Sequence, residues 1–149
     1  MKSETRYRCI EAFLRGYIRD SLFLLKCQNE LAKLAVKGDV NCQQYDQRAK
    51  RINSSDPVSR HAEAIINLEQ KIAKYKSRVD AVDMLRDKLD RGDVNAITSP
   101  RKLLQLLDDH YIGGCSMREF LRINHWGRSI FYARRRELLT VAEDYLSEL

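Results

Sequence analysis

The sequence predicts an all-α protein, a long coiled-coil-like helical hairpin followed by a C-terminal unit of three shorter helices. Three observations favour this fold class. The 149 residues include only two prolines and six glycines, which is few for a turn-rich β protein. Apolar residues recur every three or four positions over two long stretches, as on one face of a helix. Capping residues and glycines then divide the last third of the chain into short segments.

The first helix is predicted over residues 4–36. Its apolar side chains are separated by steps of three and four, and no proline interrupts them. Gly38 is placed to end this helix. The polar stretch 39–56 has no periodic pattern and is predicted to be a connector that includes a short helix around residues 43–50.

The second long helix is predicted to begin at Pro57, because "SSDP" places a capping side chain before a proline at the first helical position. It should end at Gly92. Its apolar residues form a stripe with the spacing of a heptad seam. This spacing fits antiparallel pairing with the first helix, and it would also fit a seam between two copies of the chain. Its members are Ile65, Leu68, Ile72, Tyr75, Val79, Val82, Leu85 and Leu89.

Residues 92–98 break the helical pattern and are predicted to link a scaffold (1–91) to a helix-turn-helix DNA-binding unit (99–149). In that unit, Ser99 and Pro100 start a helix over 100–111, which the pair Gly113–Gly114 stops. Ser116 and Glu119 have the spacing of a capping box for a second helix that ends near Ile123. The turn "NHWG" follows, and Arg128 opens the third helix. A helix, a short turn with glycine and a helix is the order of a helix-turn-helix.

Residues 116–136 contain six arginines and a single acid, Glu119, within a chain of net charge +6. An arginine run alone is usually a solvated helix face. Together with the capping box and the glycine turn, this local charge favours double-stranded DNA as the partner. At 100° per residue, Ser129, Tyr132, Ala133 and Arg136 fall opposite the apolar face of the third helix that contains Phe131, Leu138, Ala142, Tyr145 and Leu149.

The exposed start of the third helix is predicted to reach base edges, with arginine pairing to guanine, while the flanking arginines bind phosphates. Arg128, Arg134 and Arg135 are placed at the flanks, and Trp126 is expected to close the turn against Leu103 or Leu107. The complete predicted DNA-binding set is Arg118, Arg122, Arg128, Ser129, Tyr132, Arg134, Arg135 and Arg136.

The stretch 103–138, with "YIGG", "SMREF" and "RSIFYARRREL", resembles the C-terminal helix-turn-helix of ArpU-like phage transcriptional regulators, which is similar in turn to sigma factor region 4. The resemblance implies control of late genes in a bacteriophage or prophage, through promoter DNA and contact with RNA polymerase, in the cytoplasm of a bacterial host. The chain departs from the family at Leu121, where a small alanine is usual, at Asn124, where an aliphatic residue is usual, and at Gly127, where a capping serine is usual.

The remaining patterns exclude other classes. No phosphate loop, GxSxG or HExxH motif occurs, so an enzyme is not expected, and no cofactor is expected. His110, Cys115 and His125 lie close in sequence but have no fourth ligand at a zinc-site spacing. Four scattered cysteines, no secretory leader and no apolar run of ~20 residues indicate a cytoplasmic chain without a membrane span.

Two alternatives stay open. A phage small terminase subunit also joins a helix-turn-helix to long helices, although usually with the DNA-binding part first. A helical adaptor would instead bind a protein such as RNA polymerase, with its arginines against an acidic surface.

Overall fold

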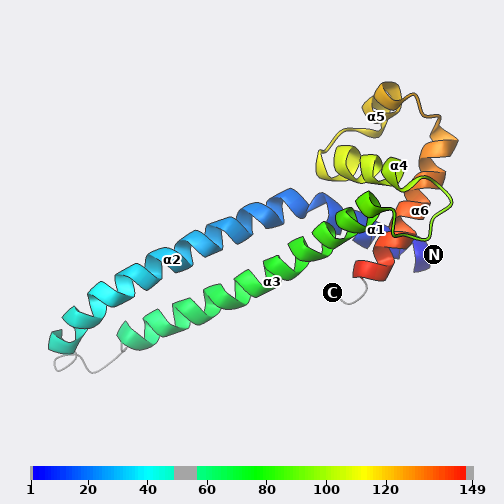
Figure 1. Cartoon of the computed structure of the whole chain (residues 1–149). Coiled ribbons are helices and arrows are strands. Elements are labelled where there is room, and N and C mark those ends of the chain that lie inside the picture. Colours follow the sequence, from blue (N-terminus) through cyan, green and yellow to red (C-terminus); the bar gives the residue numbers. More distant parts are fainter. Residues whose placement is uncertain (1, 49–56, 147–149) are drawn as a thin grey trace. The chain divides into compact units, whose positions relative to one another are not determined.

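A computed structural model describes residues 2–48 and 57–146, and it describes the side chains of residues 4–36 and 57–146. Within these ranges the chain forms helices and short connections and no β-strand, which confirms the all-α class (Figure 1). In chain order the elements are α1 (Lys2–Arg15), α2 (Tyr17–Arg48), α3 (Pro57–Arg91), α4 (Pro100–Gln105), the π-helical stretch η1 (Leu106–Ile112), α5 (Met117–Asn124) and α6 (Arg128–Leu146).

The chain divides into two compact units. The first unit combines Met1–Arg19 with Arg78–Leu149, and the second consists of Asp20–Ser77. The sequence predicted a division at residues 92–98 instead. The C-terminal helices share their unit with α1 and with the end of α3, so the predicted helix-turn-helix unit is packed on more of the chain than its own three helices.

The start of the first long helix was predicted to within two residues, but its interior break and its C-terminal end were not. Gly16 separates α1 from α2, although its amide still donates to the carbonyl of Ala12 at 3.0 Å. Gly38 does not end the helix, because α2 continues to Arg48. A glycine inside a helix costs only about 1 kcal/mol relative to alanine, which a long helix tolerates. The predicted connector therefore begins ten residues too early, and its later part, including the expected capping residues, lies outside the described residues.

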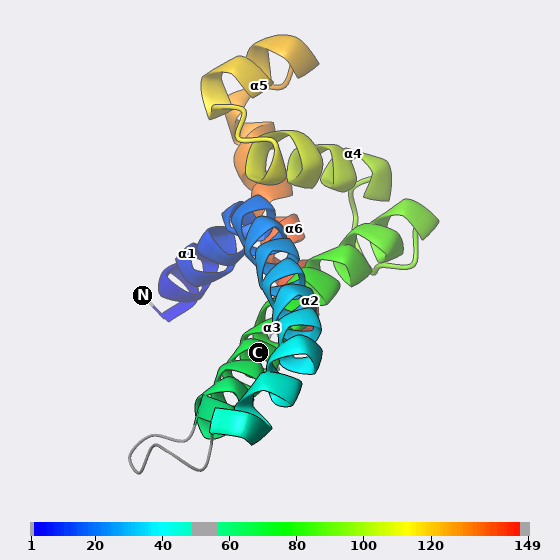
Figure 2. The same ribbon diagram turned by 90° about the vertical axis from the view of Figure 1, so that its left-hand side faces the viewer.

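In the second unit, the segments of α2 and α3 lie side by side in both views (Figures 1 and 2). The ring of Phe23 stacks on the ring of Tyr75, with centroids 5.6 Å apart. The predicted stripe on α3 faces inward here: Leu68 is buried, and Ile65, Ile72 and Tyr75 are half-buried. Among the described apolar side chains of this unit, however, only Leu68 and Cys27 are buried.

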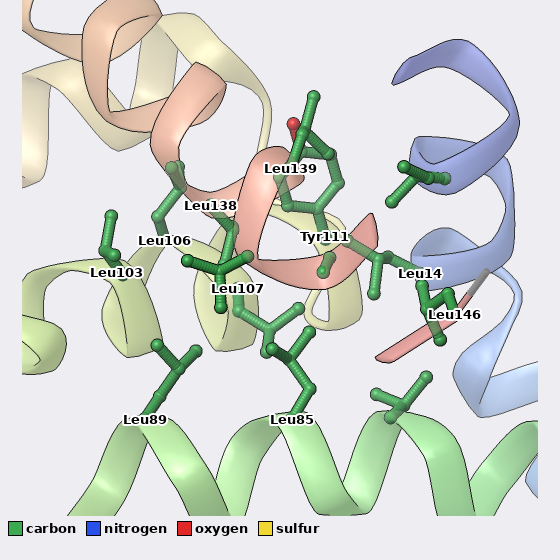
Figure 3. Packing of buried hydrophobic residues seen from close by; sticks show 14 of the residues in the cluster. Leu14, Leu85, Leu89, Leu103, Leu106, Leu107, Tyr111, Leu138, Leu139 and Leu146 are labelled. Carbon is green, nitrogen blue, oxygen red and sulfur yellow. The ribbon is translucent and has the colours of Figure 1, made fainter. Parts of the chain in front are cut away.

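The first unit has an extensive apolar core (Figure 3). Leucines of α4, η1 and α6 meet Leu85 and Leu89 of α3 and Leu14 of α1, and Tyr111 lies among them. Most of these side chains are fully buried. Burial of each large apolar side chain stabilises a fold by roughly 1.5–3 kcal/mol, so α1 and the end of α3 are integral parts of this unit.

The helix predicted over 100–111 begins at Pro100, as expected, but widens at Leu106 into η1. The Gly113 amide donates to the Asp108 carbonyl, five residues back, at 2.7 Å. A Cβ on Gly113 would lie 2.9 Å from the carbonyl oxygens of Asp108 and Asp109. Gly114 has a φ of +74°, which side chains rarely adopt. The glycine pair thus ends the helix as predicted, and each glycine is required for a different reason.

Candidate nucleic-acid interface

Helix α5 is capped as the sequence predicted. The Ser116 hydroxyl accepts a hydrogen bond from the Glu119 amide at 3.3 Å, which satisfies one of the free donors in the first turn. Phe120 is fully buried and anchors this helix to the core. The two arginines of α5, Arg118 and Arg122, are both exposed.

The turn between α5 and α6 depends on His125. This residue has a left-handed φ of 57°, and its amide and that of Trp126 both donate to the Leu121 carbonyl. Gly127, the glycine of this turn, is not among the residues with positive φ in the described chain. Its carbonyl instead accepts from the Phe131 amide at 3.0 Å, so α6 begins at Arg128, as predicted.

Trp126 packs against Phe120 at the turn and borders the apolar core of the first unit. Its ring meets Phe120 edge to face, with centroids 5.0 Å apart and an interplanar angle of 86°. The expected contact of Trp126 with Leu103 or Leu107 stays a prediction, and both leucines belong to that core. The guanidinium of Arg134 lies 4.1 Å from the centre of the same tryptophan ring. A cation–π contact of this kind holds Arg134 beside the turn and limits the positions its charge can take.

The two faces of α6 are divided as the 3.6-residue period predicts. Phe131, Leu138 and Ala142 are buried, whereas Leu149 lies outside the described residues. The opposite side of the first three turns is exposed, with Tyr132 at 45 %. Its exposed members are Arg128, Ser129, Tyr132, Ala133 and Arg136.

We call one set of exposed polar side chains the basic surface: Arg118, Arg122, Arg128, Ser129, Tyr132 and Arg136. None of its four arginines forms an ion pair with any described side chain. After Arg136 the charged residues of α6 are acidic, and two of them contact other parts of the first unit. Glu137 accepts from the Thr98 amide at 3.1 Å, and Glu143 pairs with Arg6 at 2.8 Å. The positive charge is therefore concentrated on α5 and the first turns of α6.

Arg135 does not belong to the basic surface, although the sequence placed it among the DNA-binding residues. Its guanidinium pairs with Glu11 of α1, a carboxylate only 9 % exposed. The Tyr111 hydroxyl donates to the same carboxylate at 2.8 Å. Burial alone would raise the pKa of Glu11, but the hydrogen bonds from Arg135 and Tyr111 outweigh it and lower the pKa. Burial next to this carboxylate raises the pKa of Tyr111.

Sequence reasoning missed Glu11 because its partner is 124 residues away. A weak local signal did exist. Glu11 lies between the apolar positions Ile10 and Leu14, both of which are buried, so its carboxylate had to enter the packed side of α1. A charge in such a position needs a partner of opposite charge.

His110 and Cys115, which lie close in sequence, meet through the backbone. The carbonyl of Cys115, not its thiol, lies 2.7 Å from Nδ1 of His110. Burial among aromatic rings lowers the pKa of His110. No three histidine, cysteine or acidic side chains within the described residues are grouped so that they could hold a metal ion. None of the described helices combines the length and the apolar character needed to cross a membrane.

No protein family model, curated protein or solved structure matches this chain. The basic surface of the first unit is therefore the feature from which a function can be inferred.

Proposed function

We propose that the chain binds double-stranded DNA with sequence preference and regulates transcription, with α5 and α6 acting as a helix-turn-helix. The supporting observation is the basic surface itself. Four exposed arginines, which form no ion pair with the side chains of residues 4–36 and 57–146, lie on α5 and the first turns of α6, while the other side of α6 is packed into the core. Unpaired cations on a rigid helix are what a phosphate backbone and a major groove bind.

In this proposal the first three turns of α6 enter the major groove. Arg136 pairs bidentately with a guanine, and Ser129 and Tyr132 bind base edges or phosphates. Ala133, exposed between them, is small enough to allow close approach and can contact a thymine methyl group. Arg128 and the α5 arginines bind phosphates on either side, which fixes the position of the helix on the duplex.

Arg134 binds the DNA backbone from a fixed position in this proposal. Its stacking on Trp126 holds the guanidinium at the turn, where it binds a phosphate irrespective of sequence. Arg135 has an internal role, because its pairing with Glu11 fixes α6 to α1. The adjacent residues Arg135 and Arg136 thus have different roles. Arg135 stabilises the packing of α6, and Arg136 binds DNA.

The biological setting comes from the resemblance to ArpU-like regulators. We place the protein at promoters of late genes in a bacteriophage or prophage, in the cytoplasm of a bacterial host and with RNA polymerase as a further partner. Footprinting on the DNA adjoining its own gene tests this setting directly. Protection of a promoter region supports it, and protection confined to a packaging-start sequence favours the terminase alternative.

The central test is selection of duplexes from a random library, followed by anisotropy titration on a selected and a scrambled duplex. Arg136→Ala should weaken binding to the selected duplex by about 10- to 100-fold, equivalent to roughly 1–3 kcal/mol, and hardly affect the scrambled one. Arg134→Ala should weaken both equally and reduce the salt dependence by about one charge. Arg60→Ala, an exposed arginine of α3, is the control and should change neither. Equal losses on both duplexes would remove Arg136 from base recognition, and no binding at low salt would refute the proposal.

A second candidate is supported by two exposed apolar side chains beside the arginines, Ile123 at 58 % and Ile130 at 47 %. A surface that mixes isoleucine with unpaired arginine also fits an acidic protein surface, such as one on RNA polymerase. If the chain does not bind DNA at low salt but binds purified polymerase, and Ile130→Asp abolishes that binding, the adaptor function replaces the DNA-binding one.

A further inference from the structure

Helix α2 carries an exposed stripe that no part of the described chain covers. Leu22, Leu25, Asn29, Ala32 and Val36 are separated by 3, 4, 3 and 4 positions, the spacing of a heptad seam. All five are exposed, and the large apolar members remain 63 % (Leu22), 54 % (Leu25) and 66 % (Val36) accessible. Large apolar side chains that recur in this way along one helix face indicate an interaction surface.

This stripe is separate from the one that α2 uses inside the second unit. There, Cys27 is buried, and Leu24, Leu31 and Leu34 are half-buried. The two stripes are offset by two positions, which on an α-helix turns them about 200° apart, onto nearly opposite sides. The stripe on α3, whose spacing also fits a dimer seam, packs within the chain instead, since Leu68 is buried.

We propose that the exposed α2 stripe is the contact between two copies of this chain, paired as a parallel two-stranded coiled coil. Asn29 decides the partner and the direction. By the heptad spacing, Leu22, Asn29 and Val36 are a positions, and Leu25 and Ala32 are d positions. Parallel self-pairing places each Asn29 against its own copy, where the two amides hydrogen-bond. Antiparallel pairing sets a against d, so each amide would lie unpaired against leucine or alanine, and unpaired buried amides are disfavoured.

The charges beside the stripe favour the same direction. Lys26 and Lys33 occupy the e positions, and the g positions hold the uncharged Ser21 and Gln28. In the parallel pair each lysine faces an uncharged g residue of the other copy. In an antiparallel pair the e positions face each other, which brings lysines together and destabilises the contact.

The size of the stripe sets the expected affinity. From Leu22 to Val36 it runs on the order of 20 Å along the helix. This is short of the ~800 Å² that each partner buries in a standard stable interface. Monomer and dimer should therefore exchange, with a dissociation constant of about 10–500 μM.

Sedimentation velocity on the full chain tests the contact. Over about 5 μM to 1 mM the mean mass should rise from monomer toward dimer. Leu25→Glu should weaken the dimer at least ~10-fold, because it places two carboxylates in one layer of the seam. The control is Ile66→Glu, a similarly exposed apolar residue of α3 at 52 %, which should change nothing. Both side chains are exposed in the monomer, so circular dichroism should show unaltered helix content.

Asn29→Val should tighten the dimer about 10-fold, because the polar layer costs stability while it specifies direction. Direction is measured in a background with the four native cysteines replaced by alanine. Ala32→Cys should then form an intermolecular disulfide on oxidation, whereas Ala73→Cys, an exposed α3 control, should not.

The proposal is overturned by a chain that stays monomeric to ~1 mM, by species larger than dimers, by disruption through Ile66→Glu and not Leu25→Glu, or by a dimer in which Ala32→Cys forms no crosslink. The contact does not depend on DNA binding. Arg136→Ala should leave the mass unchanged, and Leu25→Glu should leave binding to a single short site intact.

Discussion

The two units of this chain bury their apolar residues to very different extents. In the first unit Leu85, Phe120 and Phe131 are at most 2 % exposed, whereas Leu22 and Leu25 of the second unit remain 63 % and 54 % exposed. A helix contributes to a fold mainly through the apolar face that it packs, not through its own helix propensity. The first unit thus has an extensive apolar core, whereas the second unit buries few of its described apolar side chains.

The largest effect should come from truncation in the first unit. Phe120→Ala removes a fully buried ring that packs on Trp126 and Phe131, and it should lower the free energy of unfolding by about 3–5 kcal/mol. Trp126 is the single tryptophan, so its fluorescence in a urea titration reports on this unit. Leu22→Ala, measured at low micromolar concentration, should change the value by no more than about 0.5 kcal/mol. Similar losses for the two variants would erase the distinction between the units.

A smaller effect should follow from breaking the link between α1 and α6. Glu11→Gln keeps the size of the side chain but leaves Arg135 without its counter-charge, which should cost about 1–3 kcal/mol for a pair that is not wholly buried. The exposed pair of Glu4 with Arg8 is the control, and Glu4→Gln should cost less than about 0.5 kcal/mol.

The same pair predicts a pH dependence. Because the folded pKa of Glu11 is lowered, the carboxylate stabilises the native state above its unfolded pKa of about 4.3. That contribution is lost as the pH falls through the folded value. The stability difference between the wild type and Glu11→Gln should be constant near neutral pH and shrink below about pH 4. A difference that grows with acid would show that the carboxylate is not held ionised.

Local signals predicted where several helices begin. Pro57, Pro100, Ser116 and Arg128 each mark a helix start that the structure contains, because capping and proline geometry act within one turn of chain. The helix ends predicted at Gly92 and Gly113 are present, whereas the end predicted at Gly38 is wrong. Gly38 lies inside α2, while Gly16, at which no break was predicted, separates α1 from α2, so a glycine alone does not determine where a helix ends.

Part of the candidate site could be predicted, because it depends on the local period of one helix. The outward face of α6 follows from its period, and Ser129, Tyr132 and Arg136 are exposed as expected. The role of Arg135 could not be read from its neighbours, since Glu11 reaches it only through the packing of α1 on α6. Trp126 follows His125, which has a left-handed backbone conformation. The letters "NHWG" do not indicate that the histidine adopts it.

The smallest predicted effect compares one glycine from each unit. Gly38→Ala, within α2, should stabilise the chain by about 0.5–1 kcal/mol and raise its helix content, since alanine loses less conformational freedom in a helix. Gly113→Ala has the opposite sign and should cost at least ~1 kcal/mol, because its Cβ would meet two backbone oxygens at 2.9 Å. Circular dichroism melts of both variants measure the pair. A destabilising Gly38→Ala would mean that α2 is constrained as tightly as the first unit, which would remove the contrast between the units.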